Sequence, residues 1–292
     1  MSYNENRNGL SRYKVGFIGA GNMGGALIKS IARYNKEALN NNPDGGELFS
    51  VSAFDINSEL LKKLADETGI TEETSAESLA KNCDIIILAI KPQYCDNVLK
   101  EIKPAITDKK IIVSIIVGLP TQYFKSVLGS HARVVRTMPN TPALVGEGMT
   151  LISWDDSVVE EEIKAIIKLF SCSGRVEELE ESLMSEVTAL TGSSPAYVFI
   201  LIEAMADAAV KSGIQRKLAY RLAAQAVLGS AKMVLETGKH PAELKDMVCS
   251  PAGTTIEAVA ALEEEGFRNA IIKAMDQCTK KAREIGKKNF DK

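Results

Sequence analysis

The stretch KVGFIGAGNMGGALI, residues 14–28, decides the fold of the first half of the chain. Its first five residues include β-branched and aromatic side chains, which predicts a strand over 14–18. The stretch that begins at the last motif glycine, residues 24–34, has the apolar spacing of a helix. A strand, a glycine-rich turn and a helix in this order are typical of the start of an α/β domain with a parallel sheet.

The turn between this strand and helix has the spacing G-x-G-x-x-G, with Asn22 and Met23 before the third glycine. Gly19 allows the tight turn, Gly21 lets a pyrophosphate approach the backbone, and Gly24 lets the helix pack closely on the strand. The start of the helix then offers free N–H groups and a partial positive charge to phosphates. The motif therefore predicts a dinucleotide site, and a glycine-rich turn without a ligand is the alternative.

Strands and helices alternate over the rest of the first half. Residues 84–89 and 110–116 are continuous apolar runs, which are typical of strands covered on both faces in a parallel sheet. Further strands are predicted at 49–54, 133–136 and 174–177, and helices at 58–68 and 156–170. We expect a doubly wound Rossmann domain over residues 1–177, in which the polar stretch 35–48 is a surface insertion.

The second half is different, because strand-like runs disappear after residue 180. Residues 178–292 are predicted as an all-helical domain, with helices at 196–212, 217–237, 255–265 and 267–287. Alanines recur in these helices at spacings that allow close helix packing. Such helices bury their apolar stripes either against a second subunit or within a monomeric bundle, and composition allows both.

Composition and charge exclude several classes of protein. The chain has 292 residues, 45% of them hydrophobic, and a net charge of −3, which is too balanced for a nucleic-acid binder or a polybasic membrane anchor. Five cysteines without CxxC spacing and only two histidines predict reduced thiols and no metal site. The longest apolar runs fall short of the roughly 20 residues of a membrane helix, and the polar N-terminus lacks a targeting pattern. We expect a cytoplasmic protein.

Asp55 follows the second predicted strand, where an acidic side chain normally accepts hydrogen bonds from the adenosine ribose. Its distance from Gly24 exceeds the usual spacing of about 20 residues, and removing the polar insertion roughly restores it. A carboxylate repels a 2′-phosphate, so Asp55 favours NADH over NADPH. The alternative is an acid that only caps the next helix.

Two more loops follow predicted strands, at the edge where open α/β sheets bind ligands. The first contains Ala89, Lys91 and Pro92; the lysine either reaches cofactor or substrate or is a solvated loop residue. The second is the stiff loop MPNTP, residues 138–142, in which Asn140 offers a donor and an acceptor. Such a loop can hold a nicotinamide carboxamide, or it is simply a rigid turn.

In the helical half, small polar residues precede two predicted helices, in GSSPAY (192–197) and in KDMVCSPAGTT (245–255). Ser250, Thr254 and Thr255 surround Gly253, and free N–H groups at a helix start suit a carboxylate. The hydroxyls could equally act only as helix caps. A histidine acid–base pair is not evident, because His131 and His240 lie far apart in sequence and look like loop and helix-entry residues; a hydride acceptor that is already protonated needs no such pair.

At these motifs the chain resembles the pyrroline-5-carboxylate reductase family. The matching segments are VGFIGAGNMGGALI (15–28), AIKPQ (89–93), MPNTPALVGEGMT (138–150), GSSPAYVFILIEAMADAAV (192–210), AAQAVLGSAKMVLETGKHP (223–241) and LKDMVCSPAGTTIEAV (244–259). The resemblance extends from Val15 to about Arg283. It implies a Rossmann domain followed by a helical dimerisation domain, and reduction of L-1-pyrroline-5-carboxylate to L-proline with NAD(P)H.

The same resemblance implies roles for individual residues. The glycine turn, the AxKP turn, the strand end at 114–118 and Asn140 would line the cofactor. The SPxGTT segment would bind the substrate carboxylate through backbone N–H groups, and Thr255 would hydrogen-bond near the ring nitrogen as the catalytic hydroxyl. Ala252 stands where the family usually has glycine. Dimers that assemble into decamers are expected.

Two other functions remain open at this level. Hydroxyacid dehydrogenases of related architecture place a catalytic lysine on a helix of the second domain, for which Lys211 and Lys232 are the candidates by position. A protein that binds NAD(P) without turnover is the alternative outside the enzymes. Comparing turnover of a cyclic imino acid with turnover of a 3-hydroxy acid would distinguish the reductase from a hydroxyacid dehydrogenase. Cofactor binding without imine reduction would indicate a protein that binds NAD(P) without turnover.

Overall fold

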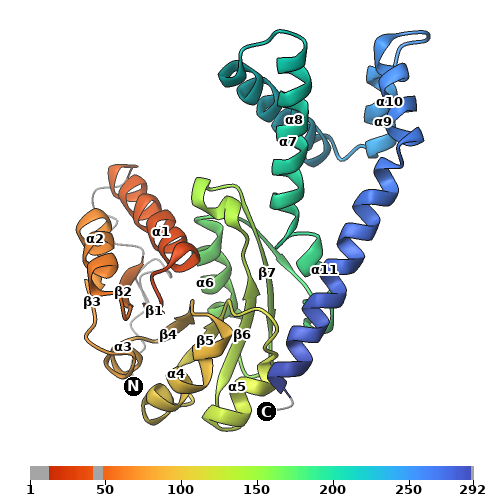
Figure 1. The fold of residues 1–292 in the computed structure, drawn as a ribbon. Coiled ribbons are helices and arrows are strands. Elements are labelled where there is room, and N and C mark those ends of the chain that lie inside the picture. Colours follow the sequence, from red (N-terminus) through yellow and green to blue (C-terminus); the bar gives the residue numbers. More distant parts are fainter. Residues whose placement is uncertain (1–12, 42–48, 291–292) are drawn as a thin grey trace. The chain divides into compact units, whose positions relative to one another are not determined.

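The computed structural model describes residues 13–41 and 49–290, which form two compact units (Figure 1). Unit 1 takes the chain to Gly192 and again from Thr279, and unit 2 is Ser193–Cys278. The division at Gly192 lies beyond the boundary predicted at residue 177. The reason is packing, because Met184 is almost fully buried in a small cluster with Met138 and Leu151 of the sheet.

Unit 1 contains an eight-stranded sheet in the order β3-β2-β1-β4-β5-β6-β7-β8. Neighbouring strands are parallel except for the pair β6 and β7. The strands are β1 Lys14–Ile18, β2 Ser50–Phe54, β3 Thr71–Glu72, β4 Ile85–Leu88, β5 Ile111–Ser114, β6 Arg133–Met138, β7 Gly148–Trp154 and β8 Gly174–Glu178. The strands from β3 to β6 have the order 3-2-1-4-5-6 of a Rossmann domain, and β7 and β8 extend the sheet beyond β6. The predicted fold class is therefore confirmed.

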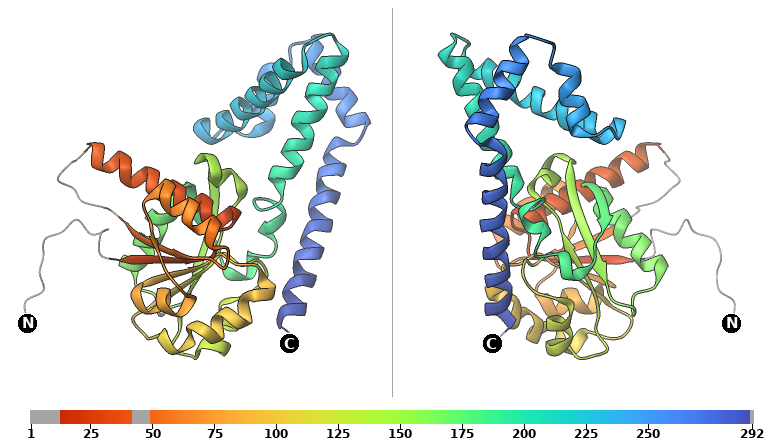
Figure 2. Two further views of the ribbon diagram at one scale, coloured as in Figure 1. Left: turned by 60° about the vertical axis from the view of Figure 1, so that its left-hand side comes forward. Right: turned by 90° about the vertical axis from the view of Figure 1, so that its right-hand side faces the viewer.

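Helices cover both faces of this sheet. The helices of unit 1 are α1 Asn22–Asn41, α2 Ser58–Thr68, α3 Ala76–Asn82, α4 Cys95–Ile102, α5 Thr121–Leu128 and α6 Glu160–Ser171. Side chains of α1, α2 and α6 share one core with Ile85 and Ile87 of β4. Side chains of α3, α4 and α5 share a second core with Ile86 and Leu88. Alternate residues of one strand thus enter opposite cores, and Figure 2 shows the sheet between α1 and α4.

The sequence predicted most strands to within a few residues and missed several elements. Helix α1 continues to Asn41, so the predicted helix end at residue 34 is wrong. Residues 35–41 belong to the helix and most are exposed at the surface, whereas residues 42–48 of the predicted insertion lie outside the described residues. The side chain of Asn35 explains part of this, because it hydrogen-bonds the backbone of Phe49 and so ties the helix to the residue before β2. Strand β7 was not predicted, and neither were β3, α3, α4 and α5.

Unit 2 is helical, as predicted. It contains α7 Ser194–Lys211, α8 Arg216–Thr237, α9 Pro241–Val248, α10 Thr254–Glu264 and the first half of α11 Phe267–Phe290. The small side chains Ala206, Ala219 and Ala223 are buried on α7 and α8, while Phe199 and Ile200 are 63% and 66% exposed. By length and composition alone, the helical stretch Val187–Lys211 is apolar enough to cross a membrane. Unit 2 therefore leaves apolar helix faces uncovered within a single chain.

Candidate functional site

The glycine turn, residues 19–24, lies at the carboxyl ends of β1, β2 and β4. The N–H of Gly19 donates to the carbonyl of Phe54 (2.8 Å), and the N–H of Ala89 donates to that of Ile18 (2.8 Å). Gly19 has φ +103°, a backbone conformation that favours glycine. A Cβ at Gly24 would lie 2.2 Å from the Gly19 carbonyl oxygen, whereas a Cβ at Gly21 would meet nothing within 4 Å. The geometry leaves one side of the turn, at Gly21, open to a ligand.

This open side fits a dinucleotide. The first turn of α1 begins at Asn22 and Met23, and helix starts present N–H groups that the helix itself cannot satisfy. Gly21 and Asn22 also border a hollow of about 260 Å³ between α1 and α2, which contains Lys29 and Lys63. Lys29 pairs with Glu67 on α2 (2.6 Å). N–H groups at a helix start, a bare glycine face and nearby cations are the features that bind a pyrophosphate.

Asp55 braces the glycine turn. One carboxylate oxygen accepts the N–H of Ala20 (2.7 Å), and the other accepts the N–H of Asn57 (2.8 Å). Helix α2 has its own cap, because the Asn57 side chain accepts the N–H of Leu60 (3.0 Å). Asp55 is therefore not that cap, and its half-buried carboxylate stands beside the glycine turn with lone pairs that the two N–H groups do not use. This is the position expected for a ribose-binding acid.

The AIKP turn follows β4, as predicted. Ala89 is half-buried, and the backbone carbonyl of Ala89 lies 2.4 Å from where a Cβ of Gly19 would stand. Lys91 is exposed and precedes the short 3-10 helix that Pro92 begins. The structure thus brings the AIKP turn against the glycine turn, and leaves the Lys91 ammonium free to reach a ligand at this edge.

Asn140 is nearly buried, and its amide group is already engaged within unit 1. Its Nδ2 donates to the carbonyl of Thr191 (3.0 Å), and its Oδ1 accepts the N–H of Met149 (2.9 Å). An amide has one further N–H and one further lone pair to offer a cofactor. The structural role of Asn140 is to fix the MPNTP loop to β7 and to the last residues of unit 1.

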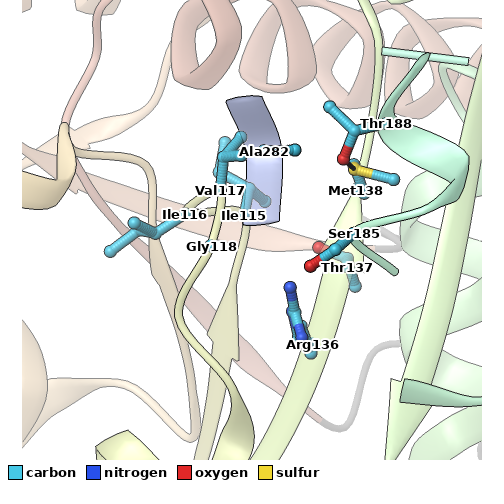
Figure 3. Close-up of a pocket in the computed structure, with 10 residues that line it drawn as sticks. All are labelled: Ile115, Ile116, Val117, Gly118, Arg136, Thr137, Met138, Ser185, Thr188 and Ala282. Atoms are coloured by element: carbon cyan, nitrogen blue, oxygen red, sulfur yellow. Dashed lines mark hydrogen bonds between the residues drawn. The ribbon is translucent and has the colours of Figure 1, made fainter. Parts of the chain in front are cut away.

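A small cavity lies beside the ends of β5 and β6 (Figure 3). Its volume of about 10 Å³ suits a single water molecule. Thr188 and Met138 lie next to one another on its wall, with Oγ1 and Sδ 3.5 Å apart. Residues 115–118, from the predicted cofactor-lining strand end 114–118, form the opposite side.

Arg136 on β6 lines this cavity and is an ionic residue that the sequence did not single out. It pairs with Glu181 (3.4 Å), which also accepts the N–H (2.7 Å) and the hydroxyl (2.6 Å) of Thr121 at the start of α5. Burial lowers the pKa of Arg136, and Glu181 opposes that shift. The network joins three elements next to the strand end that is predicted to line the cofactor. An arginine within an apolar strand is the signal that could have revealed it.

The second predicted site lies in unit 2, in residues 250–253, which we call the SPAG turn. The N–H of Gly253 donates to the carbonyl of Ser250 (3.1 Å), and α10 begins at Thr254. Gly253 is the N-cap residue of α10, and no side chain caps this helix start. The interpretation of Ser250, Thr254 and Thr255 as mere caps is therefore not supported. The first N–H groups of α10 are free for an anion such as a carboxylate.

Two contrasts sharpen this assignment. The side chains of Asn57, Ser75 and His240 cap α2, α3 and α9. Helix α10 begins without such a side chain, as α4, α5, α7 and α8 also do, although hydroxyl residues flank its start. Among the candidate lysines of a hydroxyacid dehydrogenase, Lys232 is exposed and pairs with Glu236 (3.5 Å), and Lys211 is exposed near the end of α7. Neither lysine lies in a built site within its unit.

A Rossmann domain with an open glycine turn and an acidic residue beside it is typical of the dinucleotide-dependent oxidoreductases. Comparison with known proteins agrees. Residues 14–118 match the family model of NADP oxidoreductases, coenzyme F420-dependent, and residues 181–285 match pyrroline-5-carboxylate reductase dimerisation.

Individual relatives make the assignment specific. The chain is 44% identical to the pyrroline-5-carboxylate reductase of Escherichia coli, over 94% of this chain and 98% of the relative. It is 43% identical to that of Methanosarcina acetivorans, over 96% and 100%. The crystal structure of the Plasmodium falciparum pyrroline carboxylate reductase with NADP bound aligns with a TM-score of 0.83, at 32% identity, over 95% of this chain and 100% of that chain. The chain belongs to the pyrroline-5-carboxylate reductase family.

Proposed function

We propose that the protein reduces L-1-pyrroline-5-carboxylate to L-proline with NAD(P)H, which is the last step of proline biosynthesis. The observation that supports this most strongly is the 44% identity to an Escherichia coli pyrroline-5-carboxylate reductase over almost the whole chain. The glycine turn lies within residues 14–118 and the SPAG turn within residues 181–285, the two regions that match family models. The proposal therefore rests on both units rather than on the widespread glycine motif.

The chain's own residues have separate tasks in this reaction. The glycine turn and the start of α1 bind the pyrophosphate of the cofactor, and Asp55 accepts the ribose hydroxyls. When bound, the reduced nicotinamide supplies a hydride to the carbon of the substrate C=N bond. The SPAG turn and the first N–H groups of α10 hold the substrate carboxylate. Positioning accounts for most of the rate enhancement, since the two helix starts hold the reactants in place for hydride transfer.

The proton in this reaction needs no histidine. The substrate binds as an iminium, so the nitrogen already has its proton when the hydride arrives at carbon. The Thr255 hydroxyl orients that nitrogen, directly or through water. Both histidines have other surroundings: His240 Nδ1 accepts the N–H of Ala242 at the start of α9, and His131 lies 3.4 Å from the Ile106 carbonyl.

The cofactor is NAD(P)H, and we expect the chain to prefer NADH. Asp55 places a carboxylate beside the glycine turn, where a 2′-phosphate would be repelled. The two backbone N–H groups that it accepts hold this carboxylate in place. A NADP-bound structure is known for the Plasmodium falciparum relative, so the preference expected from Asp55 has to be measured with both cofactors.

A spectrophotometric assay tests the function. Purified protein and L-1-pyrroline-5-carboxylate are mixed with NADH or NADPH, and the loss of reduced-nicotinamide absorbance is followed. Oxidation of either cofactor with formation of L-proline is the expected result, faster with NADH. A folded protein that oxidises neither cofactor would contradict the proposal. Reduction of the oxidised cofactor by a 3-hydroxy acid would instead favour a hydroxyacid dehydrogenase.

We also propose that unit 2 assembles with other copies in the cytoplasm, as dimers that form a decamer. The dimerisation family model covers residues 181–285, and the exposed Phe199 and Ile200 of α7 provide an apolar face for a partner subunit. A partner subunit would cover this face in place of a membrane. Sedimentation equilibrium without detergent should give a multiple of the monomer mass, whereas a monomer that requires detergent would contradict both points.

A further inference from the structure

Ala252 has an unusual backbone conformation. Among the described residues it is the only one other than glycine with positive φ, at +55°. For an L-residue this region costs free energy, because Cβ approaches the following carbonyl oxygen. Glycine adopts it without that penalty. A residue in such a conformation needs support from its surroundings.

The SPAG turn has the features of a type II β-turn. The N–H of Gly253 donates to the carbonyl of Ser250, Pro251 occupies the second position, and Ala252 has positive φ in the third. Type II turns place glycine or asparagine in that third position. Type I turns also accept proline in the second position, but their third residue has negative φ, which alanine adopts freely.

The surroundings do not compensate for the strain at Ala252 within this chain. The residue is exposed, so its methyl group gains little from burial. Gly253 offers a contrast, because a Cβ there would lie 2.3 Å from Ser250 Oγ. A side chain at 253 would therefore require the Ser250 hydroxyl to move, whereas at 252 the backbone conformation itself favours glycine, which is absent.

Interconversion of the two turn types would change how the turn meets an anion. Types I and II differ by turning over the peptide between the two central residues, here Pro251 and Ala252. That motion exchanges the places of the Pro251 carbonyl and the Ala252 N–H. In the type II form, the Ala252 N–H has no hydrogen-bond partner among the described residues. It is therefore available to a carboxylate.

We propose that Ala252 is a positioning residue that limits substrate affinity, because alanine lowers the population of the carboxylate-binding type II form of the SPAG turn below what glycine would allow. This inference rests on the proposed function, since it assigns the turn to the substrate carboxylate. A ligand that binds only a minor conformation binds more weakly by the fraction that is populated. The chemical step, which follows binding, is unaffected.

The test replaces Ala252 by residues of graded tolerance for positive φ. In Ala252→Gly, the KM for L-1-pyrroline-5-carboxylate should fall about fivefold, the lower end of the αL penalty, with kcat unchanged. In Ala252→Asn, KM should also fall, by about twofold, because asparagine tolerates this region although it is larger than alanine. In Ala252→Val, KM should rise. The dissociation constant of L-proline, measured by calorimetry, should follow the same order.

Gly238→Ala is the matched control. Gly238 ends α8 with φ +63°, and a Cβ there would meet nothing within 4 Å. This variant places alanine in the same backbone region away from the SPAG turn, so it should lower the melting temperature and leave KM unchanged. Melting temperatures of the Ala252 variants show that each is folded.

The outcomes separate the two proposals. A KM that follows side-chain size, with asparagine above alanine, would overturn the inference, and so would a KM that is the same in all variants. An increase in KM for Ala252→Gly would overturn it as well, since the methyl group would then contact the substrate. If the wild-type protein reduces no L-1-pyrroline-5-carboxylate, the proposed function fails and the inference with it.

Discussion

The glycine turn and the SPAG turn both precede a helix start that we propose binds an anion, but they are built differently. The glycine turn lies among the ends of three parallel strands, and a carboxylate, Asp55, braces it from β2. Its third glycine, Gly24, cannot be replaced without a shift of the turn, because a Cβ there would lie 2.2 Å from the Gly19 carbonyl oxygen. The SPAG turn lies between two helices of unit 2, and its Ala252 is exposed.

The difference indicates how each site achieves order. Packing of the sheet fixes the glycine turn before any ligand arrives, because neighbouring strands leave its backbone no other path. The SPAG turn depends on the intrinsic preferences of four residues, one of which disfavours the observed conformation. We therefore expect mutations in the first turn to act through packing and mutations in the second to act through the populations of two backbone conformations.

The largest effect is expected from Gly24→Ala. The new Cβ would stand 2.2 Å from the Gly19 oxygen and 3.1 Å from the Ala89 side chain, so the turn must shift. Overpacking of this kind costs about 1–3 kcal/mol, and the cofactor should bind about 100-fold more weakly. Fluorescence titration with NADH and thermal unfolding measure the two effects. Unchanged cofactor affinity would mean that the turn is as adaptable as the SPAG turn.

Gly21→Ala separates ligand contact from packing. A Cβ at Gly21 meets nothing within 4 Å, so the melting temperature should not change. The methyl group would nevertheless occupy the face that the pyrophosphate approaches, and cofactor affinity should fall roughly 30-fold, from one steric clash at a close backbone contact. The same titration and melting experiments apply, with Gly24→Ala for comparison. A loss of stability equal to that of Gly24→Ala would contradict the open face.

Thr255→Val tests the second site. Valine keeps the shape and removes the hydroxyl, so kcat should fall about tenfold if one hydrogen bond to the reacting nitrogen is lost. Thr255→Ser retains the hydroxyl and should restore most of the rate. Steady-state kinetics with saturating NADH measure both variants. Equal rates in valine and serine variants would assign Thr255 to structure alone.

Asp55→Asn tests the brace of the glycine turn and the cofactor preference together. The amide nitrogen of asparagine would face one of the two backbone N–H donors, from Ala20 and Asn57. Loss of the negative charge should shift the kcat/KM ratio about fivefold toward NADPH, an effect typical of one exposed charge interaction. Kinetics with both cofactors supply the ratio. An unchanged ratio, with both values reduced equally, would leave Asp55 as a brace only.

The smallest effect concerns the thiols of unit 1. Burial raises the pKa of Cys83 to about 11 and that of Cys95 to about 12, from a usual value of 9.0. The folded state thus keeps both thiols protonated where the unfolded state loses the protons. Their contribution to stability is complete below pH 9 and is lost as the pH rises through 11–12. Denaturant titrations across this range should show falling stability, and neither thiol should react with a thiol reagent at neutral pH until the protein unfolds.

Several features of the candidate sites could be predicted from the sequence, because local spacing determines them. The glycine turn, the strand before it and the helix after it need only residues that are close in the chain. Asp55 could be placed at a strand end for the same reason. Its bond to the Ala20 N–H could not, since this bond joins the loops that follow two different strands. Asn140 appeared free for a cofactor, and only the fold places Thr191 and Met149 against its amide group.

Strand β7 was missed for a related reason. Gly148–Trp154 includes glycine, threonine and serine, so its composition does not indicate a buried strand. Only its pairing with β6 on one side and with β8 on the other makes this segment a strand of the sheet. The buried Arg136 was overlooked because its partners, Glu181 and Thr121, come from segments distant in sequence.

The sequence alone therefore determined the class of fold, the helical nature of the second unit and the family, since motif spacing and hydrophobic periodicity are properties of neighbouring residues. The tertiary structure alone decided where unit 1 ends, how Asp55 and Asn140 are engaged, and that Ala252 has positive φ. These depend on contacts between distant residues, or on a backbone choice that propensity disfavours. Local chemistry specifies what a segment prefers, and long-range packing decides which of those preferences is satisfied.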